Sequence, residues 1–259
     1  MRFRIPALIV ALLLAGCGHP DYTAVRDWGR TASFAADFPP AATVVAAPGT
    51  WARPADRAQL EVGILAMQEA LTLYLTSLST WAGDGLLPYR EDPLRGQAER
   101  AAPVSVPARD AIAALGEQLR KATLENSRAP EMRDAIATAD PHVQVLVTAL
   151  SDAVAQVERA QQAERDAVTR LFRGGTAQGP NATLRWVVER EIGLQVAARA
   201  TYRTILTRIA EGHALLKARA RRITQAEAIR LIRASEDQIR RASETLPRAL
   251  ASVPPPAGS

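Results

Sequence analysis

A group of polar residues interrupts two long apolar repeats in the second half of the sequence, and these residues are the first that could do chemistry. The repeats predict two antiparallel helices, over about residues 141–173 and 182–220, joined by a turn near residue 177. Folding the chain at that turn brings four polar side chains together: Gln161, Glu164, Glu191 and Gln195. Two carboxylates held close together raise the pKa of one of them, and such a pair can bind a metal or transfer a proton.

The same four residues have a structural explanation, which we favour. A polar layer in an apolar helical interface often fixes the register of the helices, and Arg190 beside it can neutralise a carboxylate. A di-metal centre of the ferritin-like kind also needs two Glu-x-x-His pairs on facing helices. The three histidines are scattered and lack that spacing: His19, His142 and His213. We therefore interpret the layer as an element that sets helix register.

A haem group is conceivable between His213 and a methionine, Met67 or Met132, inside a four-helix bundle. A histidine at the flank of an apolar seam is far more often a hydrogen-bonded structural residue, and the sequence has no Cys-x-x-Cys-His motif. The glycine-rich turn 174–179 lacks the Gly-Lys-Ser/Thr ending of a phosphate-binding loop, and no Gly-x-Ser-x-Gly or His-Glu-x-x-His motif occurs. We predict a protein without catalytic residues, bound metal or cofactor.

The only cysteine, Cys17, lies at the end of a segment with the pattern of a secretion signal. Arg2 and Arg4 form a positive start, residues 5–14 are apolar, and small residues stand directly before the cysteine. The apolar run is too short for a transmembrane helix, which needs about 20 residues. The sequence Leu14-Ala15-Gly16-Cys17 resembles the lipobox of bacterial lipoproteins.

The resemblance implies that residues 1–16 are removed and that Cys17 carries a thioether-linked diacylglycerol and an acylated amino terminus, with palmitate as a typical acyl chain. Several acyl chains together anchor a protein stably. Gly18 follows the cysteine, at the position where an aspartate favours retention in the inner membrane. The resemblance therefore implies an anchor in the outer membrane, facing the periplasm, and leaves the inner membrane as the alternative.

The composition predicts an all-α protein and gives no reason to expect a nucleic-acid partner. Hydrophobic residues make up 47% of the 259 residues, aromatic residues make up only 5%, and alanine is abundant. This favours closely packed helices over sheets built from β-branched and aromatic residues. The formal charge is +5, of which Arg2 and Arg4 would leave with the signal. The remaining excess is small, and an exported protein does not meet nucleic acid.

The helices that would position these residues are predicted to form an antiparallel bundle over residues 54–250. A short helix over about residues 21–36 and a linker precede the bundle within residues 17–53, and residues 251–259 form a loose tail. One seam has apolar residues at alternating spacings of four and three: Leu60, Ile64, Met67, Leu71, Tyr74, Leu78 and Trp81. Residues 83–107, rich in glycine and proline, are predicted to be the least structured interior segment.

The sequence leaves two features of these helices open. Tyr22, Val25 and Trp28 share one face of the short helix, which either rests on lipid headgroups or covers the bundle core. The helix that starts near Pro141 could also extend upstream to Glu131. A further helix is predicted over about residues 107–125.

The last helix, opened by the capping-box pattern Thr224-x-x-Glu227, has an excess of basic residues. They include Arg233, Arg240 and Arg241. Such a stripe can bind anionic lipid or lipopolysaccharide headgroups, while a solvated helix face is the simpler explanation.

These patterns together predict a non-catalytic, lipid-anchored structural or partner-binding protein of the cell envelope, with another envelope protein as its partner. The alternative is a carrier of a small molecule, metal or haem, with a cavity around the polar layer of the bundle.

Overall fold

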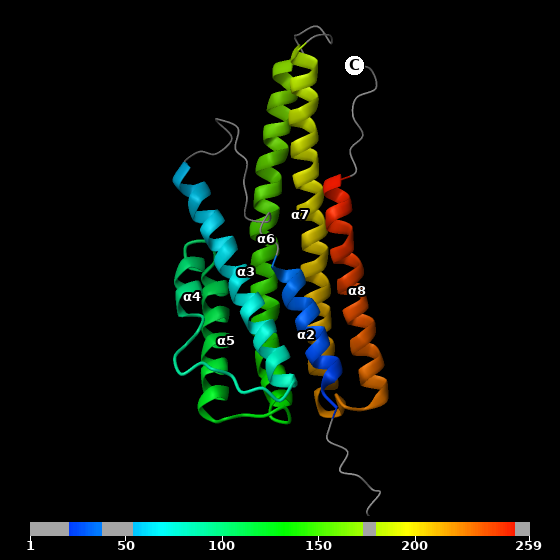
Figure 1. Cartoon of the computed structure of the whole chain (residues 1–259). Coiled ribbons are helices and arrows are strands. Elements are labelled where there is room, and N and C mark those ends of the chain that lie inside the picture. Colours follow the sequence, from blue (N-terminus) through cyan, green and yellow to red (C-terminus); the bar gives the residue numbers. More distant parts are fainter. Residues whose placement is uncertain (1–20, 38–53, 173–179, 252–259) are drawn as a thin grey trace, which may run out of the picture.

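The structure is a computed structural model that describes residues 21–37, 54–172 and 180–251. This part of the chain is all-α, as predicted, and forms an elongated antiparallel bundle in which α6 and α7 make the longest hairpin (Figure 1). Its elements are α2 (Thr23–Ala36), α3 (Pro54–Ala82), α4 (Arg95–Ala101), α5 (Val106–Leu124), α6 (Met132–Phe172), α7 (Pro180–Arg219), the 3-10 turn η2 (Ala220–Arg222) and α8 (Ala226–Ala251). None of the described helices is both long and apolar enough to cross a membrane.

The predicted seam of α3 is confirmed, because all seven of its apolar residues are buried. The short helix α2 lies beside α3 and α8 and is a member of the bundle (Figure 1). Tyr22, Val25 and Trp28 are buried in the core, and Trp28 Nε1 donates a hydrogen bond to Ser235 Oγ at 3.2 Å. Of the two alternatives for this face, the structure therefore selects the core over the lipid headgroups.

The buried residues of the described core lie between Tyr22 and Ile239. A chain that starts at Gly18 therefore keeps the complete bundle core, with all helices from α2 to α8.

The segment 83–107 is more ordered than the sequence predicts. It contains α4, and Leu87 and Leu94 are buried against the core. Tyr89 OH lies 3.0 Å from Ser77 Oγ, so the aromatic tip of this segment packs on α3. Local composition misled the prediction because glycine and proline break regular elements without saying whether apolar residues between them find a core.

Helix α6 begins at Met132, so the upstream extension of the helix near Pro141 is confirmed. Pro141 lies inside α6. A proline in a helix removes one backbone hydrogen bond and crowds the preceding turn, which favours a break in isolation. Here Ile136, Ala139 and Val143 on both sides of the proline are fully buried, and this packing keeps the helix continuous.

Gly212 on α7 lies close to side chains of α2 and α8, and its replacement by alanine is expected to destabilise the bundle. A Cβ at this position would lie 2.6 Å from Ser235 Oγ and 2.7 Å from Trp28 Nε1. We expect Gly212→Ala to lower the free energy of unfolding by about 1–3 kcal/mol, because the buried indole must shift. Urea denaturation measures this change.

Gly193 on the same helix provides the matched control. Nothing lies within 4 Å of a Cβ built there, so Gly193→Ala should raise stability by about 0.5–1 kcal/mol through helix propensity alone. If both substitutions shift the urea midpoint in the same direction, the tight approach at Gly212 is not a stability determinant.

Candidate functional site

A buried chain of hydrogen bonds joins α3, α6 and α7. Tyr74 OH lies 2.9 Å from His213 Nε2, and His213 Nδ1 lies 3.0 Å from Asp140 Oδ1. The His213 side chain is fully buried, and Trp28 lies beside it with a ring centroid distance of 6.3 Å. These residues therefore form one polar cluster in an otherwise apolar core.

Two further side chains, those of Lys217 and Gln144, donate hydrogen bonds to Asp140. Lys217 Nζ donates to Asp140 Oδ2 at 2.9 Å, and Gln144 Nε2 donates to Asp140 Oδ1 at 3.2 Å and to the Ala210 carbonyl at 2.9 Å. We call Tyr74, Asp140, Gln144, His213 and Lys217 the buried polar cluster. Its donors and acceptors are matched, as buried polar groups require.

The proton positions in the cluster follow from its geometry. An ionised Asp140 can only accept hydrogen bonds, so His213 Nδ1 carries the proton and Nε2 accepts from Tyr74 OH. The His213 hydrogen bond, together with Lys217 and Gln144, holds the pKa of Asp140 well below its usual range. Burial lowers the pKa of His213 against the opposing effect of Asp140, and burial raises the pKa of Tyr74.

The hydrogen bonds of this cluster connect side chains of three helices, α3, α6 and α7. Both ring nitrogens of His213 are engaged, so neither is available to bind haem iron in this structure, and Met67 and Met132 are ordinary buried core residues. A histidine between an aspartate and a tyrosine could move protons, but His213 is 0% exposed and Tyr74 only 4%. A substrate therefore does not reach the histidine without opening the core.

The sequence prediction identified His213 as a structural residue but missed its partners. Asp140 stands directly before Pro141, and this acidic residue at a buried position of α6 was the available signal. The spacing of His213 and Lys217 by one helical turn places both on the same face of α7, which is a second signal.

The predicted polar layer of the hairpin falls mostly on side chains outside the described residues. Of its four members, Gln161, Glu164 and Glu191 are in this category, and Gln195 is half-buried. Three residues before Gln161 along α6, Glu158 forms an ion pair with Arg203 of α7 at 3.0 Å. Arg199 is 1% exposed, and burial lowers its pKa to about 10.

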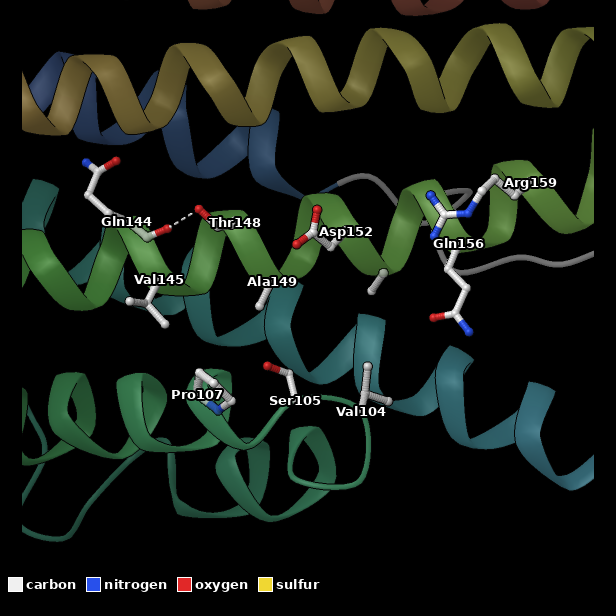
Figure 2. Close-up of a pocket in the computed structure, with 11 residues that line it drawn as sticks. Val104, Ser105, Pro107, Gln144, Val145, Thr148, Ala149, Asp152, Gln156 and Arg159 are labelled. Atoms are coloured by element: carbon white, nitrogen blue, oxygen red, sulfur yellow. Dashed lines mark hydrogen bonds between the residues drawn. The ribbon is translucent and has the colours of Figure 1, made fainter.

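An open groove of about 540 Å³ lies between α6 and the start of α5. In Figure 2, Val145 and Ala149 on α6 point toward Pro107 and Ser105 on the facing segment. The exposed fraction of Val145 is 39%, which is high for a valine beside a core. The floor of the groove is therefore an apolar surface that the described helices leave uncovered.

Two adjacent rows of α6 side chains border this groove, each with a spacing of four residues. One row is apolar and consists of Val145, Ala149 and Ala153, and the other is polar and consists of Gln144, Thr148, Asp152 and Gln156. Arg159 lies at the far end of the polar row (Figure 2). Gln144 belongs to both this row and the buried polar cluster, so the cluster fixes the helix face that forms the groove.

The arginines predicted to bind an anionic surface lie along α8 and are exposed: Arg233, Arg240 and Arg241. Arg240 forms an ion pair with Asp237 one turn before it. The helix itself begins at Ala226, and Glu227 lies 3.5 Å from Arg219. An N-cap at Thr224 would start the helix at Gln225, so α8 begins one residue later than the capping pattern predicts, and Glu227 pairs with the end of the preceding helix.

Cys17 lies outside the described residues, so the structure describes nothing at the predicted lipidation site. Within the described ranges, no three His, Cys, Asp or Glu side chains gather as a metal site would require. No protein-family model, curated protein or solved structure matches this chain. The geometry and the sequence are therefore the basis for assigning a function.

Proposed function

We propose that this protein is a non-catalytic, lipid-anchored component of the bacterial cell envelope that binds a protein partner in the groove between α5 and α6. The groove is the observation that carries the proposal. It has an apolar floor beside the exposed polar side chains of Thr148, Asp152 and Gln156, and this combination is typical of protein interfaces.

The charges of the groove specify the partner further. Asp152 and Arg159 are separated by seven residues, or about 10 Å along α6. A partner segment that lies along α6 would place a basic group near Asp152 and an acidic group near Arg159, with apolar side chains against Val145 and Ala149. The occupant we propose is such a segment of another envelope protein.

The anchor is supported by the lipobox-like sequence and by the short connection to the bundle. Thr23, the first residue of α2, follows Cys17 by six residues. Even a fully extended connection spans only about 20 Å, so the end of the bundle at which α2 begins would stay close to the membrane.

Replacing Cys17 by alanine tests the anchor. The thioether requires the cysteine sulfur, so we expect Cys17→Ala to lose acyl labelling in growing cells completely and to accumulate the unprocessed chain. Metabolic labelling with an alkyne-tagged fatty acid, read beside the chain length on a gel, measures both effects. Acyl labelling at the wild-type level in this variant would rule the anchor out.

A photo-crosslinking residue at Thr148 tests the groove, with Thr204 on α7 as the matched control. Both threonines are exposed and donate to the carbonyl four residues earlier. We expect one defined adduct in intact cells from position 148, none from 204, and its loss when Val145→Arg is added. Adducts of equal yield from both positions, or an adduct that survives Val145→Arg, would contradict a partner in this groove.

A further inference from the structure

A second hollow lies where the start of α6 meets the end of α7, and its lining is basic. It has a volume of about 610 Å³ and is formed by the start of α6 and by the end of α7 with η2. Its lining contains five basic residues and one acidic residue, Asp134: the basic residues are Arg133, Lys217, Arg219, Arg221 and Arg222. We call this hollow the basic pocket.

Two of the five basic residues have carboxylate partners. Lys217 pairs with Asp140, and Arg219 pairs with Glu227. Both stand in the last turn of α7, where basic residues also stabilise the negative end of the helix dipole, so a structural role explains them.

The other three basic residues are not explained in this way. Arg133, Arg221 and Arg222 are exposed, and no carboxylate among the described residues lies within ion-pair distance of them. Arg133 Nε donates to the Pro130 carbonyl at 2.9 Å, which fixes the base of this side chain beside the pocket. Three arginines from two separate elements therefore converge on one hollow without an acidic partner of their own. Arginine is the side chain best suited to phosphate oxygens.

The basic pocket lies at the end of the bundle where α2 begins. Figure 1 shows the start of α2, the turn η2 and the start of α8 at the same end of the molecule. Under the proposed function, this is also the end that the short connection to Cys17 keeps near the membrane. A basic pocket at that place would meet the phosphate groups of the lipid surface.

We propose that the basic pocket binds the phosphate group of anionic phospholipids and so holds the bundle end-on against the membrane to which it is anchored. This inference rests on the proposed function for the nearness of the membrane. End-on binding would use the basic pocket but not the arginines further along α8. Arg240 lies 14 residues, or about 20 Å, from the start of that helix. That distance exceeds the Debye length of about 8 Å at physiological salt, so an end-on bundle does not use Arg240 and Arg241.

Vesicle binding by the chain without its anchor tests the pocket. The fragment 18–259, which retains the complete core, is sedimented at about 0.15 M salt, where the Debye length is about 8 Å, with vesicles of phosphatidylcholine alone or with equal parts of phosphatidylcholine and phosphatidylglycerol. We expect binding only to the mixed vesicles. The variant Arg133→Gln, Arg221→Gln, Arg222→Gln should bind them about 100-fold more weakly, since each of the three basic groups near an anionic surface contributes about fivefold.

A second triple variant removes the same charge elsewhere. Arg233→Gln, Arg240→Gln, Arg241→Gln is expected to keep nearly all of the binding, with an unchanged melting temperature in both triple variants because these side chains are exposed. Equal weakening by both variants would show attraction by net charge alone, and stronger weakening by the α8 variant would show a side-on bundle. Either result overturns the proposal, as does absence of binding by the wild-type fragment.

A separate experiment tests whether the pocket binds a free phosphate compound and not a lipid phosphate. Inorganic phosphate that raises the melting temperature of the wild-type fragment but not of the pocket variant, without any vesicle binding, would assign the pocket to a free phosphate compound and overturn the lipid. Because the fragment lacks Cys17, these results do not depend on lipidation. Acyl labelling tests the proposed anchor, and vesicle sedimentation tests the proposed pocket, so the failure of one proposal can be told from the failure of the other.

Discussion

Replacing Asp140 by alanine is expected to lower the free energy of unfolding by about 3–5 kcal/mol, the largest effect of any single substitution considered in this chain. Asp140 accepts hydrogen bonds from His213, Gln144 and Lys217. Lys217 can turn to water because its side chain is 48% exposed, but the fully buried His213 Nδ1 keeps a proton without an acceptor. An unsatisfied buried donor and a small cavity both contribute to the loss. Chemical denaturation monitored by circular dichroism measures it.

Two comparisons make this prediction specific to the cluster. Asp140→Asn keeps an oxygen acceptor for His213 while placing an amide near the Lys217 ammonium, so it should cost about half as much as alanine. Arg120→Ala breaks the ion pair with Glu117 on the surface of α5 and should change stability by less than about 1 kcal/mol. If Asp140→Ala costs no more than Arg120→Ala, the cluster does not hold α6 and α7 together.

The stability of the bundle is also expected to fall as the pH drops below the ordinary pKa of histidine. Burial lowers the pKa of His213 from its ordinary value of 6.5, and the facing groups on the other elements are Tyr74 on α3, Asp140 on α6 and Trp28 on α2. Below about pH 6.5 the unfolded chain therefore takes up a proton that the folded chain does not. The free energy of unfolding should then fall by up to about 1.4 kcal/mol for each pH unit until His213 is protonated in the fold.

Protonation of Asp140 also lowers the free energy of unfolding as the pH falls, but it does so at lower pH than protonation of His213. The pKa of this carboxyl is lowered in the fold, so its stabilisation is complete above the unfolded value and is lost as the pH falls through the folded one. Between about pH 6.5 and pH 5, the change is therefore assigned to His213.

Glutamine at position 213 provides the variant that isolates this effect. Its amide can donate to Asp140 and accept from Tyr74, but it does not titrate, so His213→Gln should flatten the pH dependence of the urea midpoint between about pH 7.5 and pH 5. His142→Gln, at a half-buried position of α6 outside the cluster, is the matched control for removal of a histidine. A pH dependence that survives His213→Gln would assign acid sensitivity to other groups.

The amino-acid sequence determined the fold class, most helix positions and the core face of α3. These features follow from local information, because the spacing of apolar residues along one helix states which face must leave water. The seam from Leu60 to Trp81 shows this, since every predicted member is buried. The sequence also contains the lipobox-like motif at Cys17, which is a local pattern and stays a prediction.

The tertiary structure decided what local patterns leave open. It placed Trp28 in the core, continued α6 through Pro141 and ordered the segment 83–107, because in each case burial against distant residues outweighs the local preference. The buried polar cluster joins Tyr74 to His213 across 139 positions and His213 to Asp140 across 73 positions. The spacing of apolar residues along the sequence does not predict pairing between residues so far apart. The basic pocket likewise brings Arg133 beside Arg221 and Arg222 only because α6 and α7 pack against each other in one particular register, which the contacts of the whole core determine.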